Sequence, residues 1–243
     1  MSSIIFGPMQ LFFSQNIEYE NIFFGQEELH HLKVTRKKIG DSIIVVDGKS
    51  NAFRARIEKI TRSGAEATII SAYKSPEISA AMPYHLHLVV SPSKNLERME
   101  WLVEKVCELG IQKITFISTE HSERKKLKFD RLHRKAISAM KQSKKSFLPK
   151  FQMLTMNEFL VNEYIGTLCI AHCQGSDKTS IRNIKWQKNE PITIMIGPEG
   201  DFTPKEIHLA EQKGFKSISL GSSRLRTETA ALFAVTCVYA HFS

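Results

Sequence analysis

A strand that runs into a glycine loop and then into a helix start is the clearest feature of this chain, at residues 192–206, which read ITIMIGPEGDFTPKE. The apolar, largely β-branched run Ile192–Ile196 predicts a buried strand. Gly197–Phe202 forms the loop, and Thr203-Pro204-Lys205-Glu206 is a capping box with proline at the first helical position. The stretch therefore predicts a strand–loop–helix unit of an α/β domain.

A second unit of the same kind follows. The predicted strand Ser217–Leu220 leads into the polar loop Gly221–Arg226, and a helix opens at Thr227 or Glu228. In open α/β sheets, ligands bind at the carboxyl ends of the strands, and glycines let backbone amides approach a ligand closely. We therefore expect a binding site between the two loops. The alternative for the charged residues of the second loop is helix capping plus a structural ion pair.

Strands also alternate with helices upstream of these loops. Strands are predicted at His85–Val90, Lys113–Ile117 and Thr167–Ala171. Helices are predicted after Asn95 and Asp130, because both side chains can accept a hydrogen bond from a free backbone N–H of a first helical turn. This alternation predicts a parallel sheet, in an α/β domain at residues 84–243.

The N-terminal part of the chain has a different pattern. A helix is predicted over residues 26–38, and strands are predicted at 41–47, 53–58 and 67–72. Short strands with turn signals between them are typical of a small β-barrel. Residues 74–83 contain two prolines and several small residues, which favours a linker. The sequence thus predicts a β-barrel domain at 1–74 before the α/β domain.

Positive charge is concentrated in one segment. Residues 124–150 contain eleven lysines and arginines and one acid, Asp130, so the segment has a net charge of +10 while the whole chain has +9. A solvated helix face usually mixes signs of charge. A concentrated positive patch favours a phosphate backbone, because binding releases its counterions. We therefore expect nucleic acid as the partner, although a merely solvated surface is the plain alternative.

Composition and cysteine usage exclude several classes of protein. The most apolar stretch, Ala230–Ala240, is too short to span a membrane, and no basic region precedes an apolar segment at the N-terminus. The four cysteines form no CxxC pair. Although Cys169, His172 and Cys173 lie close in sequence, no second ligand pair with zinc spacing follows. We expect a cytoplasmic protein with reduced thiols, no metal site and no membrane association.

The C-terminal helix is apolar nearly all round. Ala230–Val235 contains no polar residue, and Val238 and Tyr239 continue the pattern. A helix without a polar face is covered on both sides. The sheet covers one side, and a partner subunit is the simplest cover for the other, so we expect a homodimer.

The two loops resemble the signature loops of the RsmE-type ribosomal RNA methyltransferases of the SPOUT superfamily. The matching stretches are Ile196-Gly197-Pro198-Glu199-Gly200-x-Phe202-x-Pro204-x-Glu206-Ile207 and Leu220-Gly221-x-x-x-Leu225-Arg226-Thr227-Glu228-Thr229-Ala230. The resemblance extends upstream through His30-His31-Leu32, Glu108-Leu109-Gly110, Ser122-Glu123-Arg124 and Lys141-Gln142-Ser143, and so covers nearly the whole chain.

The resemblance implies a fold and an activity. It implies a PUA-like β-barrel that binds RNA, followed by a SPOUT-type parallel sheet whose C-terminus forms a trefoil knot. It implies S-adenosyl-L-methionine as the cofactor and methylation of N3 of a uridine in small-subunit (16S) ribosomal RNA, by a homodimer. The alternatives are a SPOUT ribose 2′-O-methyltransferase and a non-catalytic RNA-binding assembly factor. A metal- or nucleotide-dependent enzyme is disfavoured because no suitable ligand set or phosphate-binding motif is found.

Carried onto this sequence, the resemblance assigns site residues. For the cofactor they are Ala171, His172, Ile196, Gly197, Gly200, Leu220, Gly221, Leu225 and Arg226. For RNA they are Arg36, Lys94, Arg124, Lys141, Lys144 and Lys145. As a hypothesis, Arg226 stabilises negative charge on a uracil oxygen, and Glu199 or Glu228 accepts the N3 proton. The sequence departs from the family where Asp201 replaces a usual glycine, Lys144-Lys145 a usual arginine, and Ser222 a common proline.

Overall fold

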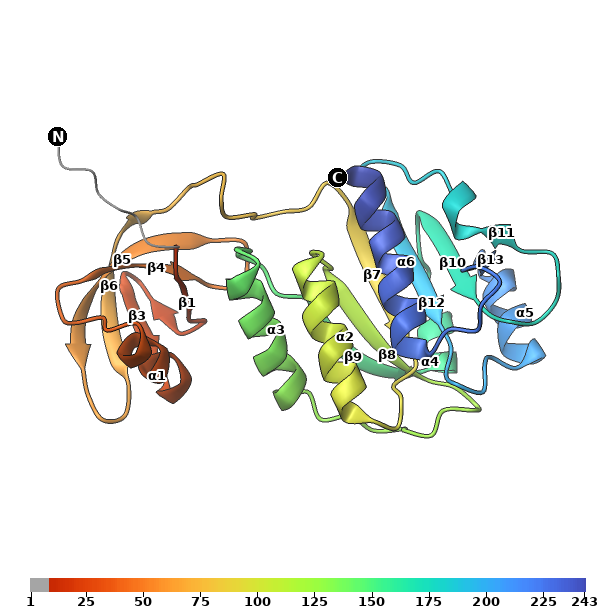
Figure 1. The fold of residues 1–243 in the computed structure, drawn as a ribbon, viewed down its shortest axis with the longest axis horizontal. Coiled ribbons are helices and arrows are strands. Elements are labelled where there is room, and N and C mark those ends of the chain that lie inside the picture. The colour runs from red at the N-terminus through yellow and green to blue at the C-terminus, as the bar shows by residue number, and fades with distance from the viewer. Residues whose placement is uncertain (1–8) are drawn as a thin grey trace. The chain divides into compact units, whose positions relative to one another are not determined.

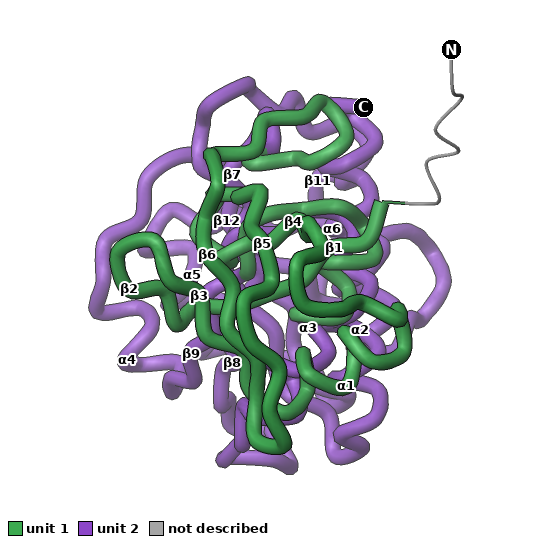
Figure 2. Tube along the Cα trace, turned by 90° about the vertical axis from the view of Figure 1, so that its left-hand side faces the viewer, with its two compact units in different colours: residues 1–81, 137–148 green, residues 82–136, 149–243 purple. Residues whose placement is uncertain are grey.

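The computed structural model describes residues 9–243, which divide into two compact units (Figure 2). The first unit contains the chain up to Ala81 together with Ile137–Leu148, and the second contains Met82–Ala136 and Pro149–Ser243. Residues 1–8, which the predicted first domain includes, lie outside the described residues. Helix α3 (Asp130–Gln142) contributes residues to both units, so the division is not one simple cut in the sequence.

The first unit is built on a six-stranded sheet in the order β1-β4-β5-β6-β3-β2. All neighbouring strands are antiparallel except β1 and β4, which are parallel. The sheet curls around a core that includes Phe12, Leu32 and Ile57, and its end strands do not pair, so it is a half-barrel (Figure 1). The strands are β1 (Leu11–Phe13), β2 (Ile17–Glu18), β3 (Asn21–Phe24), β4 (Ser42–Val46), β5 (Ala52–Ile60) and β6 (Ala65–Ala72).

The helix of this unit, α1 (Gln26–Val34), is shorter than the predicted 26–38. Arg36 has a φ of 55°, and a residue in this left-handed region cannot continue a right-handed helix. The Thr35 hydroxyl donates to the His31 carbonyl at 2.7 Å, which satisfies a carbonyl of the last turn. The helix therefore ends four residues early.

The second unit contains a seven-stranded sheet in the order β11-β13-β10-β12-β7-β8-β9, with all pairs parallel. This confirms the predicted α/β class. The strands are β7 (His85–Val90), β8 (Lys113–Ser118), β9 (Lys150–Thr155), β10 (Thr167–Ala171), β11 (Thr179–Ser180), β12 (Pro191–Ile196) and β13 (Lys216–Ser219). The sequence did not predict β9, whose alternate residues are not clearly apolar, or the two-residue β11.

Helices cover both faces of this sheet (Figure 1). On one face, α6 (Thr227–Phe242) packs on α2 (Leu96–Glu108), β7 and β12 and contacts the 3-10 helix η1 (Ile181–Asn183). On the other, α4 (Met156–Val161) and α5 (Pro204–Gln212) enclose a core that includes Phe159, Phe202 and Phe215. In α6, Ala231, Ala234 and Val238 are fully buried, whereas Phe233 and Tyr239 remain half-buried.

The predicted helix starts depend on local hydrogen bonds that the structure contains. Thr203 Oγ1 accepts from the Glu206 N–H at 3.2 Å, and Glu206 Oε2 accepts from the Thr203 N–H at 2.9 Å, which is a complete capping box. Asn95 Oδ1 accepts from the Glu97 N–H at 2.8 Å at the start of α2. Asp130, by contrast, was predicted to precede and cap a helix, but it is the first residue of α3.

No helix among residues 9–243 is long and apolar enough to cross a membrane.

Candidate functional site

Three loops meet at one edge of the parallel sheet of the second unit. Strands β13, β10 and β12 are direct neighbours, with Ala171 of β10 in register with Ile218 on one side and Ile196 on the other. The loops that follow these strands begin at His172, Gly197 and Leu220. Two of the nine residues predicted to bind the cofactor, Ala171 and Ile196, are the last residues of β10 and β12. The other seven lie in the three loops.

The loop Gly197–Phe202 is fixed by the start of α6. Thr227 Oγ1 donates to the Gly197 carbonyl at 3.0 Å, and Arg224 donates to the Glu199 carbonyl at 3.3 Å. A Cβ on Gly197 would lie 3.0 Å from the Phe202 ring, and one on Gly200 would lie 3.0 Å from His121 Cβ. A side chain at either position would require Phe202 or His121 to shift by a few tenths of an ångström, because the loop is closely packed.

Asp201 joins the loop after β12 to the loop after β10. Its Oδ2 accepts from the Cys173 N–H at 2.8 Å, and its Oδ1 accepts from the Phe202 N–H at 2.8 Å. Gln174 Nε2 also donates to the Phe202 carbonyl. The φ of Asp201 is 64°, in the region where glycine is the usual residue. The carboxylate therefore ties together two of the three loops that are predicted to bind the cofactor.

His172 is held at the end of β10 by a polar chain. Its Nε2 lies 2.8 Å from Ser217 Oγ, which donates to Glu211 Oε1 at 2.7 Å. Because the Ser217 proton is used on Glu211, His172 Nε2 is the donor to Ser217. Burial lowers the pKa of His172, and the neighbouring Lys178 lowers it further against the opposing effect of Asp201. The imidazole is therefore neutral at neutral pH.

The third loop leaves space beside its glycine. Gly221 has a φ of 128°, and no heavy atom lies within 4 Å of a Cβ built there. Leu220 and Leu225 are half-buried on either side, whereas Ala171 and Ile196 are buried. Gly221 is itself exposed, so its backbone is open to a ligand from solvent.

The three candidate catalytic residues are in different surroundings. Arg226 is exposed, and its side chain makes no hydrogen bond within residues 9–243. Glu199 is also exposed, on the loop after β12. Glu228 is buried in the first turn of α6, with Oε1 at 3.7 Å from Arg98 Nε of α2. The structure thus leaves Arg226 and Glu199 available to a ligand and gives Glu228 an ion-pair partner.

The six predicted RNA contacts are divided between the two units. Lys94 and Arg124 belong to the second unit, where Arg124 donates to the Lys94 carbonyl at 2.8 Å. The other four, Arg36, Lys141, Lys144 and Lys145, belong to the first. Arg36 is exposed and Lys145 is buried.

Three of these lysines are already ion-paired. Lys94 Nζ lies 3.5 Å from Glu123 Oε2 in an exposed pair. Lys144 Nζ lies 2.8 Å from Glu77 Oε2. Lys141 Nζ pairs with Glu28 Oε1, and His31 Nδ1 lies 3.2 Å from Glu28 Oε2. Burial opposes ionisation of Glu28, but its bonds with His31 and Lys141 outweigh that effect and lower its pKa. The fold therefore uses Lys141 and Lys144 as structural partners of acids.

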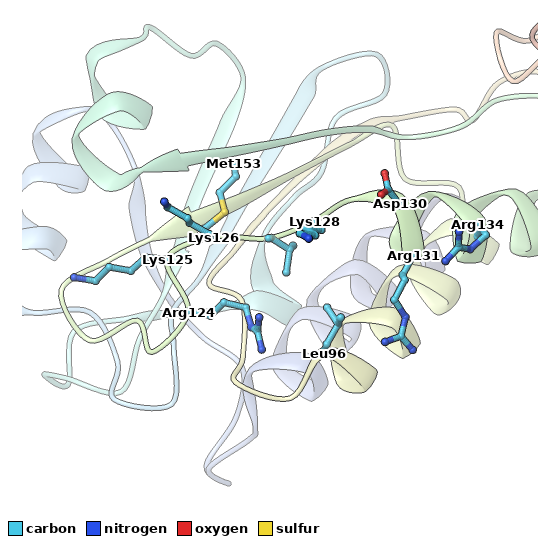
Figure 3. Close-up of a pocket in the computed structure, with 10 residues that line it drawn as sticks. Leu96, Arg124, Lys125, Lys126, Lys128, Asp130, Arg131, Arg134 and Met153 are labelled. Atoms are coloured by element: carbon cyan, nitrogen blue, oxygen red, sulfur yellow. The ribbon is translucent and has the colours of Figure 1, made fainter.

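Six lysines and arginines line a hollow of about 740 Å³ in the second unit (Figure 3). Its lining consists of Leu96, Arg124, Lys125, Lys126, Leu127, Lys128, Asp130, Arg131, Arg134 and Met153.

Several residues that shape the site gave no sign in the sequence. His121 Nδ1 lies 3.0 Å from the Gly200 carbonyl although 79 residues separate the two. Ser217, Glu211 and Arg98 likewise act through partners that are distant in sequence or on another element. Thr227, which donates to the Gly197 carbonyl, differs from these residues because it belongs to a motif that the sequence had already indicated. Within residues 9–243, no group of three or more His, Cys, Asp or Glu side chains is placed to hold a metal ion.

Comparisons with known families match both parts of the chain. Residues 80–239 match the family described as RNA methyltransferase domain, and residues 24–70 match the RNA methyltransferase PUA domain. The ribosomal RNA small subunit methyltransferase E of Rickettsia conorii is 30% identical over 217 residues, which cover 88% of this chain and 87% of that protein.

Solved structures with the same fold include two that contain bound S-adenosylmethionine. The ribosomal RNA small subunit methyltransferase E of Neisseria gonorrhoeae, bound to S-adenosyl methionine, has a TM-score of 0.82 at 27% identity over 97% of this chain and 98% of that one. A methyltransferase from Legionella pneumophila with bound SAM has a TM-score of 0.83 at 27% identity, with 97% and 98% covered. A probable rRNA-methyltransferase from Porphyromonas gingivalis is 34% identical, with a TM-score of 0.82 over 96% of this chain and 97% of that one.

Proposed function

Because the chain belongs to the RNA methyltransferase family that includes the ribosomal RNA small subunit methyltransferases E, we propose that it methylates N3 of a uridine in small-subunit ribosomal RNA. It is an S-adenosylmethionine-dependent methyltransferase of 16S ribosomal RNA. The position of the methyl group and the roles of single residues are proposals.

The observation that carries the proposal is the joining of three loops at one sheet edge. Hydrogen bonds from Thr227 and Arg224 fix the loop after β12, and Asp201 ties that loop to the one after β10. The open backbone at Gly221 between half-buried leucines fits a nucleoside cofactor. We propose that these three loops hold the cofactor. The residues that would contact it are Ala171, His172, Ile196, Gly197, Gly200, Leu220, Gly221, Leu225 and Arg226.

We propose that the cofactor supplies an electrophilic methyl group and that the protein supplies orientation and charge. Arg226, exposed and without a partner side chain, stabilises the negative charge that spreads onto a uracil oxygen as N3 loses its proton. Glu199 accepts that proton, since its carboxylate is exposed on the loop after β12. Glu228 keeps its pairing with Arg98 and holds the start of α6 in place.

We also propose that the half-barrel domain at residues 1–74 binds RNA and that the α/β domain at 84–243 carries the reaction. We propose Arg36, Lys94 and Arg124 as the RNA contacts, because Lys141 and Lys144 pair with acids of the first unit and Lys145 is buried, whereas the pair of Lys94 with Glu123 is exposed at the surface. A trefoil knot near the C-terminus stays a prediction. A ribosomal substrate also favours the cytoplasm as the place of action.

The test is methyl transfer from labelled S-adenosylmethionine to small ribosomal subunits that lack the modification, followed by nucleoside analysis. We expect the label in N3-methyluridine. At saturating S-adenosylmethionine, Arg226→Ala should lower turnover by about 100-fold or more, since loss of one oxyanion-stabilising donor costs about that much. Arg182→Ala, at an exposed arginine of the 3-10 helix η1, is the matched control.

Each other result has a defined meaning. Label that stays with the sugar after base release would identify a ribose 2′-O-methyltransferase. Absence of transfer despite tight binding of cofactor and RNA would identify an assembly factor. Unchanged turnover of Arg226→Ala would remove Arg226 from the mechanism.

A further inference from the structure

The hollow at the start of α3 gathers cations from two directions (Figure 3). Arg124, Lys125, Lys126 and Lys128 come from the loop between β8 and α3, whereas Arg131 and Arg134 come from the first turns of α3. Asp130 is the one acid in the lining. Positive side chains outnumber the single acid around this concavity, so the arrangement favours an anion that enters it.

Several of these cations lack a counterion in the fold. Arg131 Nε is 2.8 Å from Glu100 Oε1 and is therefore neutralised. Lys125, Lys126 and Lys128, by contrast, are exposed and make no ion pair within the described part of the chain. Surface lysines gain little from packing, so their charge is the property that this loop presents.

Arg124 adds a second, independent sign of a ligand. One guanidinium nitrogen donates to the Lys94 carbonyl at 2.8 Å, which fixes the group at the rim of the hollow. Its Nε is buried and has no hydrogen-bond partner in residues 9–243. A buried donor of a charged group without an acceptor is costly, and an oxygen of a bound anion would satisfy it.

The floor of the hollow limits what the anion can be. Its apolar members are Leu96, Leu127 and Met153, and no aromatic side chain lines it. RNA bases are recognised by stacking on aromatic rings and by hydrogen bonds to their edges. A set of Lys and Arg side chains without an aromatic platform instead suits phosphate groups, which carry no sequence information.

The position of the hollow relates it to the cofactor loops. The loop between β8 and α3 leaves the same carboxyl edge of the sheet as the loops after β10, β12 and β13. At its start, the Glu120 N–H donates to Glu206 Oε1 at 2.9 Å, and His121 Nδ1 lies 3.0 Å from the Gly200 carbonyl. The cationic loop is thus attached to the glycine loop of the candidate cofactor site.

We infer that this hollow is a phosphate-binding site that takes the RNA backbone next to the target nucleotide and contributes affinity without sequence preference. The inference rests on the proposed function for the identity of the RNA. It assigns to Lys125, Lys126, Lys128 and Arg124 the contacts with phosphate oxygens, and it leaves the choice of nucleotide to other residues.

The test compares two triple variants of the full-length protein. Lys125→Gln/Lys126→Gln/Lys128→Gln neutralises the hollow, while Lys185→Gln/Lys188→Gln/Lys213→Gln removes the same charge from exposed lysines that precede β12 and β13, at the amino edge of the sheet. Binding of a single-stranded fragment of 16S ribosomal RNA is measured without cofactor over a series of salt concentrations. An unrelated RNA of the same length is measured in parallel, and cofactor binding is measured by calorimetry.

We expect the hollow variant to bind both RNAs about 10- to 100-fold more weakly at 0.1 M salt, with a slope against log salt that is smaller by up to about 2, because each phosphate contact contributes about 0.7 for single strands. The control variant should change affinity by less than about 3-fold. Cofactor affinity and melting temperature should be those of the wild type. These lysines make no ion pair within residues 9–243.

Three results would overturn the inference. One is equal RNA binding by the two triple variants. Another is a loss confined to the 16S fragment, which would indicate base contacts. The third is unchanged RNA binding with lost binding to phosphatidylserine vesicles, which would indicate a membrane site. Wild-type protein that binds RNA through the hollow but transfers no methyl group would contradict the proposed function and leave the phosphate site standing.

Discussion

At the scale of single residues, Asp201 is the most informative departure from the family pattern. A glycine there would adopt the φ of 64° without strain but could not accept a side-chain hydrogen bond. The aspartate takes the same backbone conformation and bonds the N–H groups of Cys173 and Phe202. Asp and Asn are the residues that tolerate this region best among those with a side chain. Aspartate at this position is therefore less favourable for the backbone than glycine, but its side chain links two loops.

We predict that the link supports cofactor binding. Asp201→Ala loses both bonds and should raise the dissociation constant for S-adenosylmethionine about 5- to 30-fold, since each net bond contributes about 1 kcal/mol. Asp201→Asn keeps one acceptor oxygen and should fall in between. Asp201→Gly should bind as weakly as Asp201→Ala but melt at a higher temperature, because the strain is relieved.

Isothermal calorimetry and thermal melting distinguish these variants. Asp177→Ala is the matched control, since it removes an exposed acid from the same loop region without removing a hydrogen bond of the described residues. Wild-type cofactor affinity in Asp201→Ala would show that the link has no part in binding.

At the scale of elements, three neighbouring strands share one buried polar contact. His87 Nε2 of β7 lies 2.7 Å from Thr115 Oγ1 of β8, to which Gln152 Nε2 of β9 donates at 2.7 Å. Burial, together with the smaller effect of the nearby Lys113, lowers the pKa of His87 to about 3. The Thr115 hydroxyl therefore joins the three strands through its bonds with His87 and Gln152. The imidazole of His87 stays neutral while the protein is folded.

This histidine makes stability depend on pH. Unfolded His87 takes up a proton as the pH falls through about 6.5, whereas folded His87 stays neutral until about pH 3. The unfolded state thus binds more protons in this window, so stability rises with pH and is lost as the pH falls. Between pH 7.5 and 5 we expect this group to remove about 1–2 kcal/mol from the free energy of unfolding.

Urea unfolding at the two pH values measures the effect. His87→Gln should lose most of this pH dependence, while His85→Gln, at an exposed histidine of the same strand, should keep it. An equal pH dependence in His87→Gln and the wild type would assign the effect to other groups.

At the scale of the whole molecule, the outer face of α6 is the unexplained surface. Leu232, Phe233, Cys237 and Tyr239 are only half-buried, although the other face of the helix is buried against α2 and the sheet. Burial of a large apolar side chain contributes about 1.5–3 kcal/mol. A second copy of the chain would supply that burial, which is the basis of the proposed homodimer.

Light scattering tests the dimer. We expect the wild type at twice the chain mass of 27.7 kDa and Phe233→Glu at the chain mass, because a buried carboxylate without a partner is unfavourable. Val161→Glu places the same charge on an exposed apolar residue of α4, on the opposite face of the sheet, and should remain a dimer. A monomeric wild type would contradict the homodimer directly.

The sequence by itself determined the features that are encoded within a few residues. Thr203-Pro204-Lys205-Glu206 predicts its helix start because both capping partners lie in one turn, and Ile192–Ile196 predicts its strand by composition alone. The parallel sheet follows from the alternation of such units, and the two loop motifs indicated the family. Strands of two or three residues, such as Ile17–Glu18, were missed because they are too short to show a period.

Only the tertiary structure decided which partners the charged and polar residues have. Lys141 was a predicted RNA contact, but it pairs with Glu28, 113 residues away, and Glu228 pairs with Arg98 of another helix. Asp201 became a link only when β10 and β12 brought Cys173 beside it, across 28 residues. Side-chain type sets what a residue can bond, whereas the choice among distant partners depends on packing. That choice arises only when the sheet assembles.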